Sequence, residues 1–522
     1  MRNYLHRVLG IPPLVSIRDR MAPIGQFLAD LNNLRRAIQA ISFGFLAFLI
    51  VQTAYPLELP VPADLYLRFD PLIAMVSFIT GKAFVWKMAP ALILLALIII
   101  FGNFFCGWLC PLGSAIDLSD YLLFRRAKRS AANPIPTLKS KHYILVVVLV
   151  ASLFSVQFLF LMDPISLITR TLVVVFFPSS VYMINAASAK FQALFPGNGW
   201  VNVDLAQPVF KLNLLILAFF ALILILGAIR RRFWCRYLCP LGSLLSLSNR
   251  FRLFQRFVAK ACNDCGRCQK ACPMGAVSAD PRNYNADDCI LCLRCMDCPP
   301  EAVTFSPLVP ALSRSRGLNL SRRYFMGSTA MGLFLAVAFK ANPLQASSAK
   351  LNQRLIRPPG SVPEDRFVSL CIGCGECLKV CPNNALQATF LEAGLSGIYT
   401  PRLVSRIGYC EQYCNLCGKV CPTAAIREVT VEEKQKIQIG LARIDKTRCM
   451  RWADNILCLV CNEQCSYQAI DLDEEKRPVV NKEKCVGCGI CENKCPVIGE
   501  AAIIVYSLGP EQGRLPERRA NG

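Results

Sequence analysis

The chain of 522 residues contains only two histidines, His6 and His142. Haem groups in membrane helices are commonly held by histidines, so a pair of bis-histidine haems cannot be assembled from this sequence. A zinc or copper centre built mainly from histidine is excluded for the same reason. A glycine-rich phosphate loop after a strand and a candidate Ser-His-Asp set are also missing, which leaves nucleotide-driven and hydrolytic roles without support.

Acidic residues are scarce in one part of the chain only. The 58 Lys and Arg outnumber the 35 Asp and Glu, and residues 1–347 account for +20 of the net charge of +23. There the basic residues cluster beside apolar runs, which is the pattern of cytoplasmic loops in membrane proteins. A nucleic-acid-binding protein would more often carry a basic stripe on a soluble domain, so we expect no nucleic-acid partner.

Four apolar segments have the length of membrane spans. Their approximate bounds are residues 38–55, 89–105, 142–162 and 209–229. The N-terminal segment and the loops at 125–141 and 230–260 carry six to eight Lys and Arg each, which places them in the cytoplasm. A fifth apolar stretch at 165–184 is interrupted by Arg170 and Pro178, and we interpret it as a re-entrant or interfacial segment, with a true span as the alternative.

An internal repeat supports this topology. Each half contains an Asp-Pro turn, a re-entrant piece, a returning span and a Cys-x3-Cys-Pro motif. The repeated residues are Asp70, Cys106 and Cys110 in the first half and Asp163, Cys235 and Cys239 in the second. The aspartates either cap their turns or accept protons. The cysteines, four residues apart, either act as dithiols, bind a soft metal, or close the ends of two spans, and the two pairs could meet across the repeat axis.

The other 24 of the 28 cysteines form six sets of four with the spacing that binds [4Fe-4S] clusters. Residues 250–307 hold Cys262, Cys265, Cys268 and Cys272, then Cys289, Cys292, Cys295 and Cys298. The later sets are Cys371, Cys374, Cys377 and Cys381; Cys410, Cys414, Cys417 and Cys421; Cys449, Cys458, Cys461 and Cys465; and Cys485, Cys488, Cys491 and Cys495.

Three sets depart from the usual spacing. The gap before Cys298 is one residue short, the gap after Cys410 is one residue long, and Cys449 stands apart from its triplet, whose last cysteine precedes Ser466 instead of proline. Disulfides and zinc sites explain these sets poorly, because the triplets are too close to pair internally and too numerous for tetrahedral zinc. The spacing therefore predicts six clusters.

Residues 308–347 contain Arg322 and Arg323, followed by about sixteen mostly apolar residues. One interpretation is a twin-arginine export signal that remains as a fifth span. The alternative is an amphipathic or buried helix that follows two arginines. Clusters are assembled in the cytoplasm, so an exported cluster domain must cross the membrane folded. A twin-arginine signal would place the domain after it in the periplasm.

These motifs resemble two protein families. Residues 1–307 resemble NapH-type membrane ferredoxins, with four spans, two Cys-x3-Cys-Pro motifs and two cytoplasmic clusters. Residues 315–522 resemble NapG or MauM-type proteins, with a twin-arginine signal and four periplasmic clusters. The resemblance implies a fusion of the two.

The resemblance also implies which cysteines bind each cluster. In two-cluster ferredoxins, the fourth cysteine of one motif completes the cluster of the other motif. Cys298 would complete the set that begins at Cys262, and Cys272 the set that begins at Cys289. In the C-terminal domain, resemblance to four-cluster electron-transfer subunits implies that the two outer motifs pair with each other, and the two inner motifs likewise.

The predicted fold is multidomain, with an α-helical membrane domain of four spans plus a fifth and two α+β ferredoxin-like [4Fe-4S] domains. The expected divisions are a cytoplasmic tail at 1–37, a four-span domain at 38–249, a cytoplasmic two-cluster domain at 250–307, a linker with the signal or fifth span at 308–347, and a periplasmic four-cluster domain at 348–522.

The resemblance implies a haem-free quinol dehydrogenase module in the bacterial inner membrane. Menaquinol or ubiquinol would give electrons to the clusters, and a periplasmic reductase, of nitrate-reductase type, or a cytochrome would accept them. The alternative is a maturation factor that reduces copper or another cofactor for a respiratory metalloenzyme. A hydrocarbon layer of about 30 Å separates the two cluster sets, so either quinol carries electrons across or the sets serve different partners.

Overall fold

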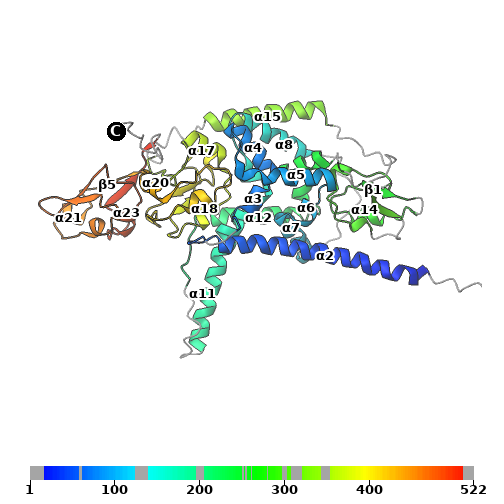
Figure 1. Cartoon of the computed structure of the whole chain (residues 1–522), viewed down its shortest axis with the longest axis horizontal. Coiled ribbons are helices and arrows are strands. Elements are labelled where there is room, and N and C mark those ends of the chain that lie inside the picture. The colour runs from blue at the N-terminus through cyan, green and yellow to red at the C-terminus, as the bar shows by residue number, and fades with distance from the viewer. Residues whose placement is uncertain are drawn as a thin grey trace, which may run out of the picture.

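The computed structural model describes residues 17–57, 61–123, 139–194, 205–249, 252, 255–259, 262–278, 280–296, 302–306, 320–341 and 353–509, with side chains from residue 32 onward. A helical domain lies between two cysteine-rich domains, which occupy opposite ends of the long axis of the molecule (Figure 1). The domain nearer the N-terminus in sequence comprises residues 255–306, and the other comprises residues 353–509.

The helical domain consists mostly of short helices packed around a core that includes Leu72, Ile73, Ile165 and Leu245. Its helices are α2 (Ile17–Gln52), α3 (Leu65–Arg68), α4 (Pro71–Gly81), α5 (Pro90–Phe101), α6 (Phe105–Trp108), α7 (Pro111–Leu122), α8 (Ser140–Leu153), α9 (Leu159–Met162), α10 (Pro164–Thr171), α11 (Phe177–Leu194), α12 (Asn213–Leu226) and α13 (Pro240–Ser248). A 3-10 turn η1 (Trp86–Met88) and two π-helical turns, η2 (Leu172–Phe176) and η4 (Trp234–Leu238), complete it.

Two helices within the described ranges are long and apolar enough to cross a membrane, over Asn32–Gln52 and Pro164–Leu194. The first coincides with the span predicted at 38–55. The other three predicted spans correspond to shorter apolar helices over Trp86–Phe101, Ser140–Leu153 and Asn213–Leu226. Four full-length spans plus a fifth are therefore not confirmed by the helix lengths.

A re-entrant segment turns back on itself, whereas α10, η2 and α11 form one continuous helix of 31 residues, so the re-entrant part of the prediction for residues 165–184 is wrong. The interfacial alternative stays a prediction. Proline in a helix removes a donor and clashes with the carbonyl four residues earlier. Here Pro178 lies two residues after the widened π-helical turn of Leu172–Phe176, which accommodates that clash. The hydroxyls of Ser179 and Ser180 donate to the carbonyl oxygens four residues before them, at 2.7 and 2.8 Å.

The predicted repeat is present in the helical domain. Asp70 begins α4 and accepts hydrogen bonds from two backbone N–H groups, and Asp163 begins α10 and accepts one. Both carboxyls are fully buried and interact with each other. Cys110 and Cys239 occupy equivalent positions before the prolines that begin α7 and α13. The capping role of the two aspartates is therefore confirmed.

The domain of residues 255–306 is a small α+β unit. Its strands β1 (Gln255–Val258) and β2 (Val303–Ser306) pair antiparallel, and between them lie α14 (Arg267–Ala271) and the 3-10 turns η6 (Ala286–Asp288) and η7 (Arg294–Met296).

The domain of residues 353–509 contains three two-stranded antiparallel sheets, which pair β3 with β4, β5 with β8 and β6 with β7. Its strands are β3 (Leu386–Ala388), β4 (Pro401–Leu403), β5 (Leu441–Ile444), β6 (Ile470–Leu472), β7 (Pro478–Val480) and β8 (Ile503–Tyr506). Its helices are α17 (Glu364–Leu370), α18 (Glu376–Lys379), α19 (Leu416–Lys419), α20 (Val431–Gln435), α21 (Met450–Ala453), α22 (Val460–Glu463) and α23 (Ile490–Lys494), with the 3-10 turn η8 (Leu395–Gly397). Both cysteine-rich domains thus combine short helices with antiparallel strands, as the predicted α+β cluster domains do.

The arginine pair of the expected export signal begins helix α15 (Arg322–Ala341), which lies along α8 in Figure 1. The buried face of α15 is a stripe of small residues four apart, Ser328, Gly332 and Ala336. Stripes of this kind let two helix backbones approach closely in membranes. α15 is not one of the two helices that pass the length and apolarity test, so its role as a signal or fifth span stays a prediction.

Replacing Gly332 with leucine should separate α15 from α8. A Cβ atom at this position would lie 2.9 Å from the Cβ of Val150 and 3.0 Å from the carbonyl oxygen of Val147. Overpacking of this kind costs about 1–3 kcal/mol, so the detergent-solubilised Gly332→Leu protein should unfold at a lower temperature. The matched control is Gly327→Leu, because Gly327 lies on the same helix with no atom within 4 Å of its Cβ position. Equal melting temperatures for the two variants would contradict the packing described here.

Candidate iron–sulfur centres

The first C-terminal cysteine triplet forms a loop that leads into α18. Gly373 and Gly375 within it have φ of 61° and 87°, a left-handed conformation that side chains disfavour, so glycine allows the loop to curl round its contents. Cys371, Cys374 and Cys377 line a cavity of about 390 Å³ whose fourth cysteine is Cys421. We call this set site A.

Three further cavities in the same domain repeat this arrangement of a triplet and one distant cysteine. Site B comprises Cys410, Cys414 and Cys417 with Cys381; site C comprises Cys449, Cys458 and Cys461 with Cys495; and site D comprises Cys485, Cys488 and Cys491 with Cys465. Their volumes are about 390, 390 and 310 Å³. All sixteen cysteines predicted as ligands in this domain therefore fall into four cavities.

The predicted pairing of outer with outer and inner with inner motifs is wrong. The first motif exchanges its fourth cysteine with the second, and the third exchanges with the fourth. The strands explain this result. β3 and β4 pair between the first two motifs, while β5 and β8 pair around the last two and enclose them in one unit. The domain thus consists of two consecutive two-cluster units.

The four sites form a row. Cys377 of site A interacts with Cys417 of site B, and the backbone N–H of Cys410 in site B donates to the carbonyl of Cys488 in site D at 2.8 Å. Cys491 of site D interacts in turn with Cys461 of site C. The order in space is therefore A, B, D, C, and electrons can pass between neighbouring sites along the domain.

Burial controls the protonation of these thiols. It raises the pKa of Cys371, Cys461 and Cys488 to about 12, because the thiolate is poorly solvated in the protein interior. A cluster must therefore displace protons when it binds. Backbone N–H groups stabilise the thiolate form of the fourth cysteine at two of the sites. Ile426 donates to the sulfur of Cys421 in site A at 3.5 Å, and Ala469 donates to that of Cys465 in site D at 3.2 Å.

In the 255–306 domain, Cys272 interacts with Cys289 and Cys292, and Cys295 interacts with all three. This is the crossed arrangement that two-cluster ferredoxins show. The other triplet, Cys262, Cys265 and Cys268, lies within the described residues, while its expected partner Cys298 lies outside them.

The cysteines of the two Cys-x3-Cys-Pro motifs meet in the helical domain. Cys106, Cys110, Cys235 and Cys239 line one cavity of about 490 Å³, which we call the four-thiol cavity. The expectation that the two pairs meet across the repeat is confirmed. Arg232 is fully buried beside the cavity, donating to the carbonyl of Cys106 at 2.8 Å and to both carboxylate oxygens of Asp117.

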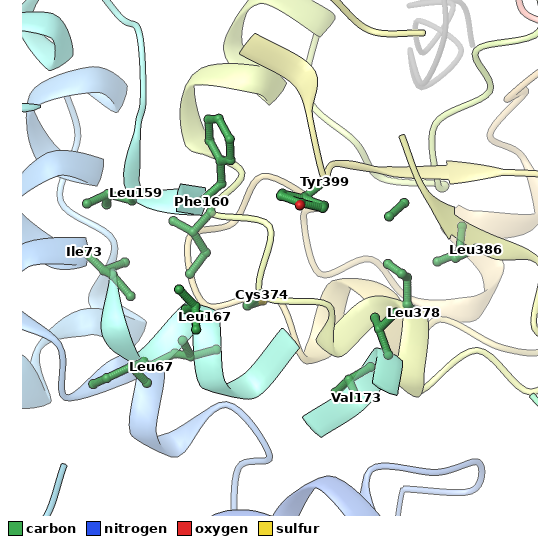
Figure 2. Close-up of a cluster of buried hydrophobic side chains, with 14 of the residues drawn as sticks. Leu67, Ile73, Leu159, Phe160, Leu167, Val173, Cys374, Leu378, Leu386 and Tyr399 are labelled. Atoms are coloured by element: carbon green, nitrogen blue, oxygen red, sulfur yellow. The ribbon is translucent and has the colours of Figure 1, made fainter. Parts of the chain in front are cut away.

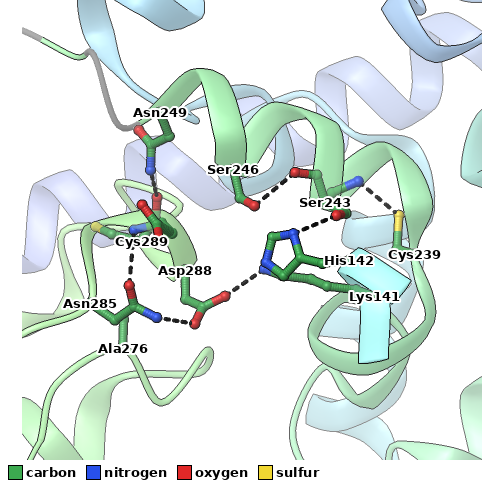
Figure 3. Close-up of polar contacts among 12 residues, drawn as sticks. Lys141, His142, Cys239, Ser243, Ser246, Asn249, Ala276, Asn285, Asp288 and Cys289 are labelled. Atoms are coloured by element: carbon green, nitrogen blue, oxygen red, sulfur yellow. Dashed lines mark hydrogen bonds and ion pairs between the residues drawn. The ribbon is translucent and has the colours of Figure 1, made fainter. Parts of the chain in front are cut away.

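The 255–306 domain docks against the same cavity (Figure 3). Lys141 of α8 lines the cavity and forms an ion pair with Asp288, and Asn249 donates to the carbonyl oxygens of Ala286 and Cys289. The buried His142 forms a 2.7 Å hydrogen bond with Ser243, so its Nδ1 is engaged in packing α8 against α13.

Site A docks against the opposite end of the helical domain. The buried Arg170 donates to the carbonyl oxygens of Phe160 at 2.7 Å and of Gly373, in the site A loop, at 3.2 Å. Its guanidinium carbon lies 4.1 Å from the centre of the Tyr399 ring. The apolar core continues across this contact: side chains of α3, α4, α9 and α10 lie beside Cys374, Leu378 and Tyr399 in Figure 2.

Two charged residues beside site A share this contact. Lys379 donates to the carbonyl oxygen of Thr53 at 2.9 Å, and burial lowers its pKa to about 8. Burial and repulsion by Asp64 raise the pKa of Glu376 to about 8. The sequence did not lead us to Glu376 or Lys379, and we treated Arg170 only as an interruption of the apolar stretch at 165–184. The available signal was a charge inside an apolar run, which requires a partner elsewhere in the fold.

Comparisons with known proteins agree with these sites. A 4Fe-4S binding domain model matches residues 83–130 and 212–258, and a 4Fe-4S dicluster domain model matches residues 370–425 and 456–498. The ferredoxin-type protein NapG of Escherichia coli is 34% identical over 221 residues, which is 39% of this chain and 93% of that protein. The chain belongs to the family of NapG and MauM ferredoxin-type proteins.

Other relatives extend this result. The methylamine utilization ferredoxin-type protein MauM of Methylorubrum extorquens is 33% identical over 38% of this chain and 96% of its own length. An uncharacterized protein of Methanocaldococcus jannaschii is 27% identical over 54% of this chain and 91% of its own length. No solved structure matches significantly. This NapG/MauM-type chain is thus an iron–sulfur electron-transfer protein.

The ligand pairing can be tested by counting iron after anaerobic purification. Cys371→Ala and Cys421→Ala should each remove the cluster of site A, about four iron atoms, because a [4Fe-4S] cluster needs four thiolates. The double variant Cys371→Ala/Cys421→Ala should lose no more than either single variant. The control Cys371→Ala/Cys410→Ala should lose about eight, since its ligands belong to sites A and B. A loss of about eight from the first double variant would exclude the pairing.

Proposed function

We propose that the chain is a quinol dehydrogenase module of the bacterial inner membrane, in which a NapH-like membrane part is joined to the NapG/MauM-type ferredoxin. The observation that carries this proposal is the order of the sites. The C-terminal row of clusters begins with site A, held directly against the helical domain by Arg170, and extends away from it through sites B, D and C. Electrons from a membrane-embedded quinol would enter this row at site A.

Several features support a placement across the membrane. The two cluster-bearing domains lie at opposite ends of the helical domain, and α2 runs along the axis that joins them (Figure 1). The basic loops of the helical half support a cytoplasmic position for the 255–306 domain. Arg322 and Arg323 at the start of α15 fit export of the C-terminal domain to the periplasm.

The far end of the row is suited to an acceptor protein. Near the site C ligands Cys458 and Cys495, the side chains of Ile456, Leu457 and Ile498 are exposed by 50%, 62% and 95%. Exposed apolar side chains beside a redox centre fit a docking surface. Residues 348–522 carry 23 basic and 20 acidic residues, and four clusters that each contribute about −2 would make this domain acidic. We expect an acceptor with a basic rim, such as a periplasmic reductase of nitrate-reductase type or a cytochrome.

The function is tested by reduction with menaquinol. The protein is purified anaerobically in detergent, menaquinol is titrated in, and reduced clusters are quantified by EPR. We expect four or more clusters to be reduced by quinol alone. The control is the same titration with Arg170→Leu, which removes the contact between α10 and the site A loop and should slow reduction of the C-terminal sites while leaving the iron content unchanged.

No cluster reduction by menaquinol would favour the second candidate function, a maturation factor that reduces copper or another cofactor. The four-thiol cavity beside the cluster domain of residues 255–306 is the observation that favours it, because thiols next to a reductant can hold a soft metal. Reduction of added Cu(II) by dithionite-reduced protein, lost in Cys106→Ala, would support that function.

The topology is tested with reporters. β-Lactamase, which can cross the membrane folded and protects cells from ampicillin only outside the cytoplasm, should give resistance when fused after Gly522 and none when fused after Ser306. Replacing Arg322 and Arg323 with lysines should abolish the resistance given by the first fusion, because twin-arginine export depends on the arginine pair. Resistance that survives this change would exclude the export signal, and resistance from the fusion after Ser306 would reverse the topology.

A further inference from the structure

We infer that Cys106, Cys110, Cys235 and Cys239 together hold one further iron–sulfur cluster, of the [4Fe-4S] type, inside the helical domain. This would be a seventh cluster, in addition to the six sets that the cysteine spacing predicts. Each of its two ligand pairs comes from one half of the internal repeat, so neither half can hold the cluster alone. The inference rests on the geometry of the cavity and does not depend on quinol as the electron donor.

The arrangement of the sulfurs fits a polynuclear cluster. Cys106, Cys110, Cys235 and Cys239 all line one cavity. Sites A to D show the same arrangement, in which four cysteines from two stretches of the chain surround one cavity.

The backbone around these cysteines repeats that of an established type of cluster ligand. Cys239 precedes a proline with φ −73° and ψ 111°, and Cys272 precedes a proline with φ −71° and ψ 111°. The sulfur of Cys239 accepts from the N–H of Gly242 at 3.2 Å, and that of Cys272 accepts from Ala276 at 3.3 Å. Hydrogen bonds of this kind stabilise a thiolate and tune the potential of a cluster.

The surrounding charge suits a buried anion. A [4Fe-4S] cluster with four thiolates carries a net charge of about −2 or −1, which is costly to bury without a compensating cation. Arg232 is fully buried and interacts with the thiols of Cys106 and Cys235. It shares Asp117 with the buried Arg35, so two guanidinium groups face one carboxylate and leave a net positive charge beside the cavity. Lys141 also lines the cavity, where it is paired with Asp288.

The family comparison gives independent support. The 4Fe-4S binding domain model matches residues 83–130 and 212–258, and each matched segment contains only two cysteines. A single segment therefore lacks two of the four thiolates that a [4Fe-4S] cluster requires. A cluster shared between the two segments supplies all four.

This cluster would lie between the clusters of the 255–306 domain and those of the C-terminal domain. The cavity is lined by Asp288 and Ile290, which flank the ligand Cys289, and by Pro164 at the start of α10. Arg170, six residues further along α10, contacts the site A loop. Six residues of helix rise about 9 Å. A cluster in the four-thiol cavity would accept one electron from a neighbouring cluster and donate it to the next, on the line between the cytoplasmic pair and site A.

The experiment is an iron count combined with Mössbauer spectroscopy on the full chain, purified anaerobically. The wild type should contain about 28 iron atoms, because seven [4Fe-4S] clusters contain four each. Cys239→Ser and Cys106→Ser should each lose about four, and the double variant should lose no more than one single variant. The matched control is Ser246→Ala, on the helix α13 that follows Cys239 and outside the cavity, which should lose none.

Each outcome decides the inference. An unchanged iron content in Cys239→Ser, or the loss of a single iron atom, would overturn it, since the latter indicates a mononuclear site. Where the variants fail to fold, the wild type decides: about 24 iron atoms with only six clusters in the Mössbauer spectrum would refute the seventh cluster. The count needs no quinol, so its result is separate from failure of the menaquinol titration.

Discussion

The fold depends on one constraint: each cavity lined by four cysteines takes them from two separate stretches of the chain. Site A needs Cys421 as well as the triplet that begins at Cys371, and the four-thiol cavity needs both halves of the helical domain. The strands that close the C-terminal units are only three or four residues long, so they supply little stability of their own. The clusters are therefore structural elements as well as redox centres, because binding them fixes the approach of distant segments.

Burial of Arg170 ties the C-terminal domain to the helical domain. A guanidinium inside an apolar helix is costly unless its donors are paired, and here two carbonyl oxygens and the face of Tyr399 provide the partners. One of those carbonyls and the ring belong to the C-terminal domain. Moving that domain away would leave the charge buried without these partners, so site A stays at a fixed position against α10.

Local features of the sequence predicted the chemistry well and long-range contacts poorly. A triplet such as Cys371, Cys374 and Cys377 is a local loop, so its spacing alone identifies a cluster site. The partner of that triplet depends on which strands pair, and the likeness to other four-cluster proteins led to the wrong choice. The continuous helix through Pro178 was missed for a similar reason, since the π-helical turn before it leaves no local signal. Arg170 signals that a buried partner is needed, but the sequence does not show which residue supplies it.

The four thiols lie where the helices of the helical domain are interrupted. A helix of 14 residues, such as α12, is about 21 Å long, less than the hydrocarbon thickness of about 30 Å. Short turns follow such helices: α6 carries Cys106, the π-helical turn η4 carries Cys235, and both cysteines line the four-thiol cavity. The interruption of the helices and the burial of the four thiols are thus two aspects of one arrangement.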